Sequence, residues 1–268
     1  MEQAIKLSLE KALGKTEEDA TVSLKAAQVV VAALKRLRYA TRVGDLRELR
    51  AAMDGMEKAE LALRQQIATA IAGWDFNGET YLANGSFTAE VLAVAEQKGV
   101  RIFERDDRLY CYPVLIRVSP AESAILIDKA KERKLRPTVL VNRLKELQKR
   151  PPRFRPEAFL EALYETYGKA VKLRGKALFG SGTVVPLLEI YVLFTLLPGQ
   201  SKEYSKHEFA RDIYLLDRSG VTTTKKGARV SFPASTGTKL ASRTLAVINE
   251  LGEEKKYYGI SFSPANKE

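Results

Sequence analysis

Cysteine and histidine each occur only once in this chain of 268 residues, as Cys111 and His207. One cysteine excludes an intrachain disulfide and a cysteine-based zinc site, and it fits a reducing compartment. One histidine leaves a Ser-His-Asp or Cys-His mechanism with a single possible base. Because Cys111 lies in an expected strand and His207 in the first turn of an expected helix, we expect a small buried thiol and an imidazole at or just beneath the surface.

Long apolar runs are also missing. The longest one, residues 184–197, is interrupted by Pro186 and Glu189 and is too short to cross a bilayer, so it predicts a buried strand or helix. The first 15 residues carry acids and lack the apolar core of a signal peptide. With 45% hydrophobic and 29% charged residues, the composition is typical of a folded protein. We therefore expect a soluble, cytoplasmic protein with no membrane partner.

Catalytic motifs are incomplete. Residues 179–183 (FGSGT) and 235–239 (STGTK) lack the spacing of a nucleotide-phosphate loop. Glu104, Asp106 and Asp107 cluster, but at a predicted hairpin turn, where Asp is common for conformational reasons alone. The sequence predicts a protein that is not an enzyme and needs no cofactor or metal, with a metal-dependent nuclease as a less favoured alternative.

Positive charge is what the sequence has in excess, and most of it lies in one segment. The formal net charge is +11, and residues 131–176 alone hold 14 Lys or Arg against 5 acids. Basic charge concentrated in this way indicates a polyanionic partner, most often nucleic acid.

Residues 1–75 are predicted to form a helical hairpin. Its antiparallel helices are expected at 21–40 and 45–74, with Gly44 ending the first and a variant capping box at Asp45 starting the second. The second helix carries an apolar row that is expected to pack on a partner helix: Leu46, Leu49, Met53, Met56, Leu63, Ile67 and Trp74. We expect residues 21–74 to bind a protein partner or to mediate self-association.

Five arginines crowd the bend between these two helices: Arg36, Arg38, Arg42, Arg47 and Arg50. They fit a solvated helix end, which is the simpler interpretation, or a tip that contacts phosphates. The sequence leaves both open.

Residues 76–150 are predicted to form a unit of winged-helix or helix-turn-helix type. Two Asn-Gly pairs within 77–86 indicate turns around a short strand, and a short helix follows at 87–98. A hairpin is expected over 100–112, and Pro113 favours an edge position for its second strand.

The second half of this unit carries strong helix-start signals. Ser119, Pro120 and Glu122 combine an N-cap, a proline at the first helical position and a capping box, so we expect a helix as far as about Lys134. A break at Pro137 and a second helix over 138–149 complete the outline of a helix-turn-helix.

A basic connector and helix are expected at 151–176, and a second winged-helix-like unit at 177–268. Pro156 opens a helix whose apolar face holds Phe159, Leu160, Leu163, Tyr164 and Tyr167. A capping box at Ser205 predicts a helix over 206–217. Strands are expected at 229–232, 244–249 and 257–262, the last two forming a hairpin.

The fold class that these elements predict is α+β and predominantly α. An N-terminal helical hairpin is followed by two small winged-helix-like units, each a helix plus a β-hairpin.

The basic helix at 138–149 is the main candidate for nucleic-acid contact. Its expected buried stripe is Val139, Leu140, Leu144 and Leu147, which leaves the polar side chains outside it. Arg and Asn suit the guanine and adenine edges of the major groove, whereas Lys neutralises phosphate. The expected contact residues of this helix and its flanks are Lys134, Arg136, Asn142, Arg143, Lys145, Lys149 and Arg150. A solvated helix surface is the alternative.

Two further segments are candidate contacts. The proline-stiffened connector at 150–156 could insert Arg153 and Arg155 into a minor groove, or it could be a soluble linker. The hydroxyl-rich stretch 222–239 could follow a phosphate backbone through its cations, Lys225, Lys226, Arg229 and Lys239.

The expected function is non-catalytic binding of double-stranded DNA, as a subunit of a larger nucleoprotein complex. One alternative is an interaction subunit whose basic face meets an acidic protein surface. Another is an RNA-binding protein.

Overall fold

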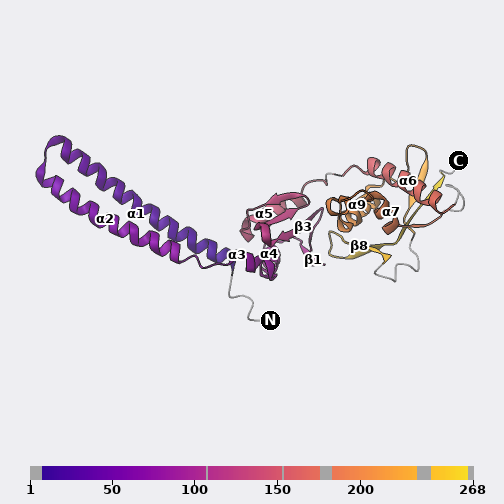
Figure 1. Cartoon of the computed structure of the whole chain (residues 1–268), viewed down its shortest axis with the longest axis horizontal. Helices are drawn as coiled ribbons and strands as arrows, with labels where there is room; N and C mark the ends of the chain where they lie inside the picture. Colours follow the sequence, from indigo (N-terminus) through magenta and orange to yellow (C-terminus); the bar gives the residue numbers. More distant parts are fainter. Residues whose placement is uncertain (1–7, 107, 153, 176–182, 234–242, 265–268) are drawn as a thin grey trace. The chain divides into compact units, whose positions relative to one another are not determined.

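A computed structural model describes residues 8–106, 108–152, 154–175, 183–233 and 243–264 (Figure 1). The protein is mixed helix and sheet and is 59% helical. The chain divides into two compact units: Met1–Val100 with Arg117–Lys145, and Arg101–Ile116 with Glu146–Glu268. Within the described ranges, each helix is too short or too polar to traverse a lipid bilayer.

Two long helices, α1 (Leu9–Val43) and α2 (Leu46–Ala72), lie side by side and confirm the predicted N-terminal pair (Figure 1). Gly44 takes the left-handed conformation (φ 75°) that ends α1. Asp45 then accepts hydrogen bonds from the backbone N–H groups of Arg47 and Glu48, which caps α2. The bend is therefore formed by the residues whose local signals predicted it.

The first helix begins at Leu9, earlier than the predicted residue 21, because its N-terminus is capped twice. The Ser8 hydroxyl accepts a hydrogen bond from the N–H of Lys11. The Glu90 carboxylate, on α4 (Ser86–Gln97), accepts from the Ser8 hydroxyl at 2.5 Å and from the N–H of Leu9 at 2.9 Å. A carboxylate at this end also offsets the helix dipole.

The seam between α1 and α2 is built from small residues. Ala40, Ala52 and Ala59 are buried there, whereas the predicted apolar row of α2 is split. Leu49, Met56 and Leu63 are half-buried. Large side chains instead face outward: Val22, Leu24, Val29, Val31, Leu34, Tyr39, Val43, Leu46, Met53, Leu61, Ile67 and Ile71. The hairpin thus buries little of its own large apolar surface.

The segment after the hairpin is helical, so the strand expected within 77–86 is wrong. Asn77 accepts a hydrogen bond from the N–H of Thr80 and caps α3 (Gly78–Ala83). Here the Asn-Gly pair starts a helix and not a hairpin turn. The reason is that the Asn77 side chain accepts a hydrogen bond from the backbone three residues later, as a helix cap does. The helix expected at 87–98 is confirmed as α4, and Gly99 follows it at φ 64°.

Five antiparallel strands form a meander in the order β1-β2-β3-β4-β5. Their bounds are β1 (Phe103–Arg105), β2 (Arg108–Cys111), β3 (Val114–Ser119), β4 (Ala124–Ile127) and β5 (Ala130–Glu132). The predicted β1–β2 hairpin is confirmed. The prediction that β2 would be an edge strand is wrong, because β2 lies between β1 and β3. Pro113 occupies the turn that joins β2 to β3.

The helix expected from Ser119 to about Lys134 does not form. Pro120–Glu122 make one 3₁₀ turn, Ser119 makes no capping bond to it, and Ser123 at φ 45° ends it. The apolar segment that follows, which contains the β-branched Ile125 and Ile127, becomes strand β4, and Asp128 at φ 52° turns the chain into β5. Because the first helix of the predicted helix-turn-helix is absent here, that interpretation is wrong, although the second helix is present as α5 (Pro137–Gln148).

The unit that includes Glu146–Glu268 contains three main helices and a small sheet. They are α6 (Pro156–Leu173), α7 (Leu187–Phe194) and α9 (Lys206–Ser219), with a short α8 (Gln200–Glu203) before α9. The sheet order is β6-β10-β7, from β6 (Val185–Pro186), β10 (Gly259–Pro264) and β7 (Ala228–Ser231). Phe209 lies at the core, with the rings of Phe159, Tyr191 and Phe194 around it.

The capping box at Ser205 is confirmed, with both reciprocal bonds to Glu208.

The C-terminal hairpin differs from its prediction. β8 (Leu245–Ile248) pairs with β9 (Glu254–Tyr257), while the expected partner segment forms β10 and pairs with β6 and β7. The sheets as a whole do not confirm two winged-helix units.

Candidate nucleic-acid interface

The basic helix α5 is anchored by Leu140, Val141 and Leu144, which are fully buried. The predicted stripe was therefore partly wrong: Val139 is 44% exposed and Val141 takes its place. This register leaves the polar side chains at 142, 143 and 145 exposed, as expected. Their surroundings decide what each of them can do.

Arg136, just before α5, is held by two acids of α1. Its Nε atom donates to Glu10 at 2.7 Å, and its Nη1 atom donates to Glu17 at 2.6 Å. The Glu10 carboxylate also accepts from the N–H of Thr138 at 2.9 Å and so caps α5. Burial raises the pKa of Glu10, but the hydrogen bonds from Thr138 and Arg136 outweigh it and lower the pKa below its ordinary value.

Three more candidates on α5 have partners in the same unit. Arg143 pairs with Glu132, a largely buried carboxylate that also accepts from the N–H of Lys134 at 2.8 Å. The Asn142 side-chain oxygen accepts from Lys98 at 2.8 Å. Lys145 donates to the backbone carbonyl of Lys98 at 3.1 Å. A groove-reading role for Asn142 and Arg143 would require these bonds to break.

Some cations of the basic segment are free. Within the described part of the chain, the side chains of Lys134, Arg150 and Arg155 are exposed and form no ion pair. Lys149 makes only a surface pair with Glu146 at 2.8 Å. Arg153 lies outside the described residues.

The C-terminal candidates are partly engaged. Lys226 pairs with Glu165 at 3.2 Å and lies over the Tyr164 ring, and the bond to Glu165 raises its pKa. The backbone N–H of Lys225 donates to Glu161 at 2.6 Å. Arg229 is exposed on β7, and Lys239 lies outside the described residues.

Helix α9 is contacted by side chains from β2, β9 and the turn after β8. From β9, Lys255 and Tyr257 both reach Asp217, at 2.6 and 2.7 Å. From the turn after β8, Glu250 accepts from Tyr214 at 2.5 Å and pairs with Arg218. Tyr110 of β2 hydrogen-bonds the Nδ1 atom of His207 at 2.9 Å. These bonds would have to break before α9 could enter a major groove.

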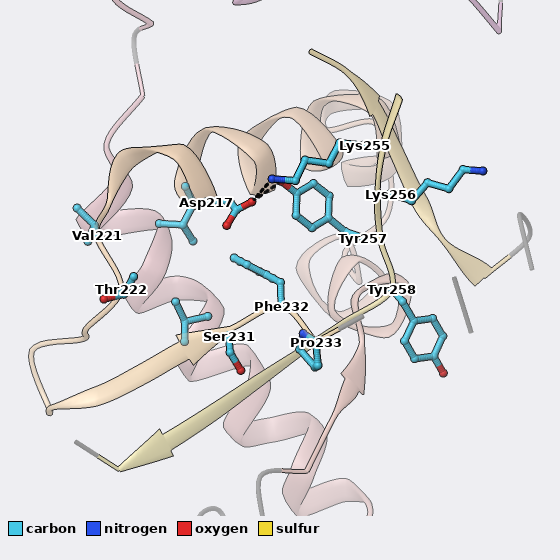
Figure 2. Close-up of a pocket in the computed structure, with 12 residues that line it drawn as sticks. Asp217, Val221, Thr222, Ser231, Phe232, Pro233, Lys255, Lys256, Tyr257 and Tyr258 are labelled. Atoms are coloured by element: carbon cyan, nitrogen blue, oxygen red, sulfur yellow. Dashed lines mark hydrogen bonds and ion pairs between the residues drawn. The ribbon is translucent and has the colours of Figure 1, made fainter. Parts of the chain in front are cut away.

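A pocket of about 360 Å³ lies between the end of α9, β7 and β9 (Figure 2). Figure 2 shows the Asp217 carboxylate bound by Lys255 and Tyr257, with Phe232 turned toward the Tyr257 ring. Lys256 and Tyr258 point away from the pocket. The inward cation, Lys255, is therefore neutralised by Asp217, and Tyr257 is too buried to stack on a nucleic-acid base.

The Cys111 thiol and the His207 imidazole both have pKa values away from their ordinary ones. Burial raises the pKa of the Cys111 thiol to about 12, and burial together with the Arg108 charge lowers the pKa of His207. Among the described residues, no three His, Cys, Asp or Glu side chains come close enough to hold a metal ion.

The sequence could not show which arginines are paired. Glu10 and Arg136 are 126 residues apart, and neither segment carries a motif that joins them. The acids near the start of α1 were the only signal in the sequence.

Comparisons with models of protein families, with curated proteins and with solved structures found no match. The candidate interface therefore rests on the geometry and charge of this chain alone.

Proposed function

We propose that the protein binds double-stranded DNA without catalysis, as a subunit of a larger nucleoprotein complex in the cytoplasm. The observation that carries this proposal is the charge of residues 131–176, in which 14 cations face 5 acids. Among the predicted binding residues in the described part of this segment, Lys134, Arg150 and Arg155 are exposed and form no ion pair. They are therefore the groups most available to phosphate.

The test is a salt series of duplex binding, followed by fluorescence anisotropy of a labelled mixed-sequence duplex. The parent chain is compared with the triple variant Lys134→Gln, Arg150→Gln and Arg155→Gln. We expect the slope of log K against log salt to fall by about 0.9 for each phosphate that the variant no longer neutralises. A parent chain that does not bind duplex, or that binds structured RNA far more tightly, would contradict the proposal.

A non-catalytic role is supported by the state of the two most reactive side chains. The Cys111 thiol is buried, and its raised pKa keeps it protonated at neutral pH. His207 is hydrogen-bonded through Nδ1 to the Tyr110 hydroxyl, and burial raises the pKa of that hydroxyl, so it stays protonated at neutral pH. Hydrolysis of a nucleic acid by the purified chain with Mg²⁺ or Mn²⁺ would contradict this part of the proposal.

The winged-helix interpretation remains a hypothesis for the C-terminal unit. Helix α9 and the later β8–β9 hairpin support it, since a helix followed by a β-hairpin is the outline on which this interpretation rests. The covered face of α9 means that DNA binding through this helix is not part of the proposal.

The second candidate function is that of an interaction subunit, which the outward apolar side chains of the α1–α2 hairpin favour. Leu46 is 76% exposed and Ile71 is 72% exposed, and such surface in a row is typical of a protein interface. Light scattering of the parent chain and of a Met53→Glu, Ile67→Glu variant tests association through residues 21–74. If both are monomers and neither captures a partner, this candidate fails.

A further inference from the structure

The arginines at the bend of the α1–α2 hairpin form a cluster in which positive charge exceeds negative charge. Arg36, Arg38, Arg42, Arg47 and Arg50 are all exposed, and within the described residues none of them forms an ion pair. Only two acids lie between residues 35 and 50, and Asp45 already accepts the capping bonds of α2. This cluster contrasts with Arg136 and Arg143, which have carboxylate partners.

The bend also concentrates these groups in space. Arg36 precedes Gly44 by eight residues and Arg50 follows it by six, so at ~1.5 Å per residue all five lie within about 12 Å of the end of the hairpin. Double-stranded DNA carries one phosphate per ~1.7 Å of its axis, so a cluster of this size meets several phosphates at once.

We propose that the end of the α1–α2 hairpin is a second, phosphate-contacting site for nucleic acid. Guanidinium groups suit this role because they bind phosphate oxygens through paired N–H donors. Lying side-on, two helices of ~10 Å each are wider than the ~12 Å major groove, so the arginines meet the backbone and not the base edges. Binding at this site is independent of base sequence.

This inference rests on the proposed nucleic-acid function, and a pair of matched variants tests it in the full chain. The tip variant carries Arg38→Gln, Arg42→Gln, Arg47→Gln and Arg50→Gln. The control variant carries Lys11→Gln, Lys15→Gln, Lys25→Gln and Lys58→Gln, which removes the same charge from exposed positions farther along the same two helices. Circular dichroism of both variants checks that the hairpin is intact.

We expect the tip variant to bind a mixed-sequence duplex at least tenfold more weakly at low salt, with a salt slope smaller by up to ~3.6 if each arginine meets one phosphate. The control variant should stay within about threefold of the parent, and two unrelated duplex sequences should give equal results.

Several outcomes overturn the inference. Equal losses in the tip and control variants would show an effect of net charge alone. If the tip variant binds as the parent does, while the Lys134, Arg150 and Arg155 variant does not, DNA binding stands and the tip site fails. If poly-glutamate displaces the duplex from the parent at equal charge concentration, and the tip variant loses this sensitivity, the tip binds acidic protein. A parent that binds no nucleic acid removes both proposals.

Discussion

The arginines in and just before α5 differ from those at the α1–α2 bend in the groups that surround them. Arg136 and Arg143 are matched to Glu10, Glu17 and Glu132, and those bonds fasten one element to another. The bend arginines extend into solvent without acidic partners among the described residues. The same side chain therefore stabilises the fold in one region and is available to a ligand in the other. Basic composition alone does not separate these two roles.

The largest expected difference between the two regions concerns apolar anchoring. Leu144 lies on the buried face of α5, so Leu144→Ala should lower the free energy of unfolding by about 2–5 kcal/mol. Leu46, at the bend, is 76% exposed, and Leu46→Ala should change it by less than ~0.5 kcal/mol. Urea unfolding followed by circular dichroism measures both. Equal losses would mean that the bend is covered in solution.

The second largest difference is expected when a guanidinium group is removed, because the loss of unfolding free energy should depend on whether the arginine has an acidic partner. Arg143→Gln leaves the largely buried Glu132 carboxylate without its cation, and we expect a loss of about 1–3 kcal/mol in unfolding free energy. Arg42→Gln, the control at the bend, should leave stability unchanged. A stable Arg143→Gln protein would show that the ion pair contributes nothing and would weaken the contrast.

The pH dependence of stability should reveal the link between α1 and α5. The pKa of Glu10 is lowered in the folded state, so its stabilisation is complete above the ordinary value of 4.5 and is lost as the pH falls through the folded value. Glu10→Gln should therefore be less stable than the parent at neutral pH and should lose less on acidification. Thermal unfolding at several pH values between ~7 and ~3 tests this. Parallel curves for the two proteins would contradict it.

The smallest effect is expected midway along the hairpin. Arg64 and Glu60 form an exposed pair at 2.7 Å, four residues apart on α2. Arg64→Gln should cost only about 0.3–0.5 kcal/mol, and salt should remove the difference. A loss above ~1 kcal/mol would indicate that this face of α2 is buried against another molecule.

Elements with local signals were predicted well from the sequence. Gly44 and Asp45 marked the bend, and Ser205 with Glu208 marked the start of α9, because each of these groups bonds its own neighbouring backbone. The same kind of signal failed at Ser119, where the following apolar residues of β4 pair across the sheet and override the helix start.

The candidate site was less predictable, because it depends on pairs that are distant in the sequence. The basic character of 131–176 was evident, but its division into paired and free cations was not. Arg143 pairs with Glu132 only because a strand replaces the expected helix before α5. DNA binding by residues Lys134 to Arg155 stays a prediction.

The two carboxylates that cap α1 and α5 give the hairpin a mechanical property. Glu90 of α4 holds the first turn of α1, and Glu10 in that same turn holds the start of α5. The root of a helix of 35 residues, about 50 Å long, is thus clamped on two sides. A tilt of ~5° at this clamp would swing the far end by about 4 Å, roughly one residue of extended chain. The direction in which α1 leaves α4 and α5 is therefore set by these two carboxylates.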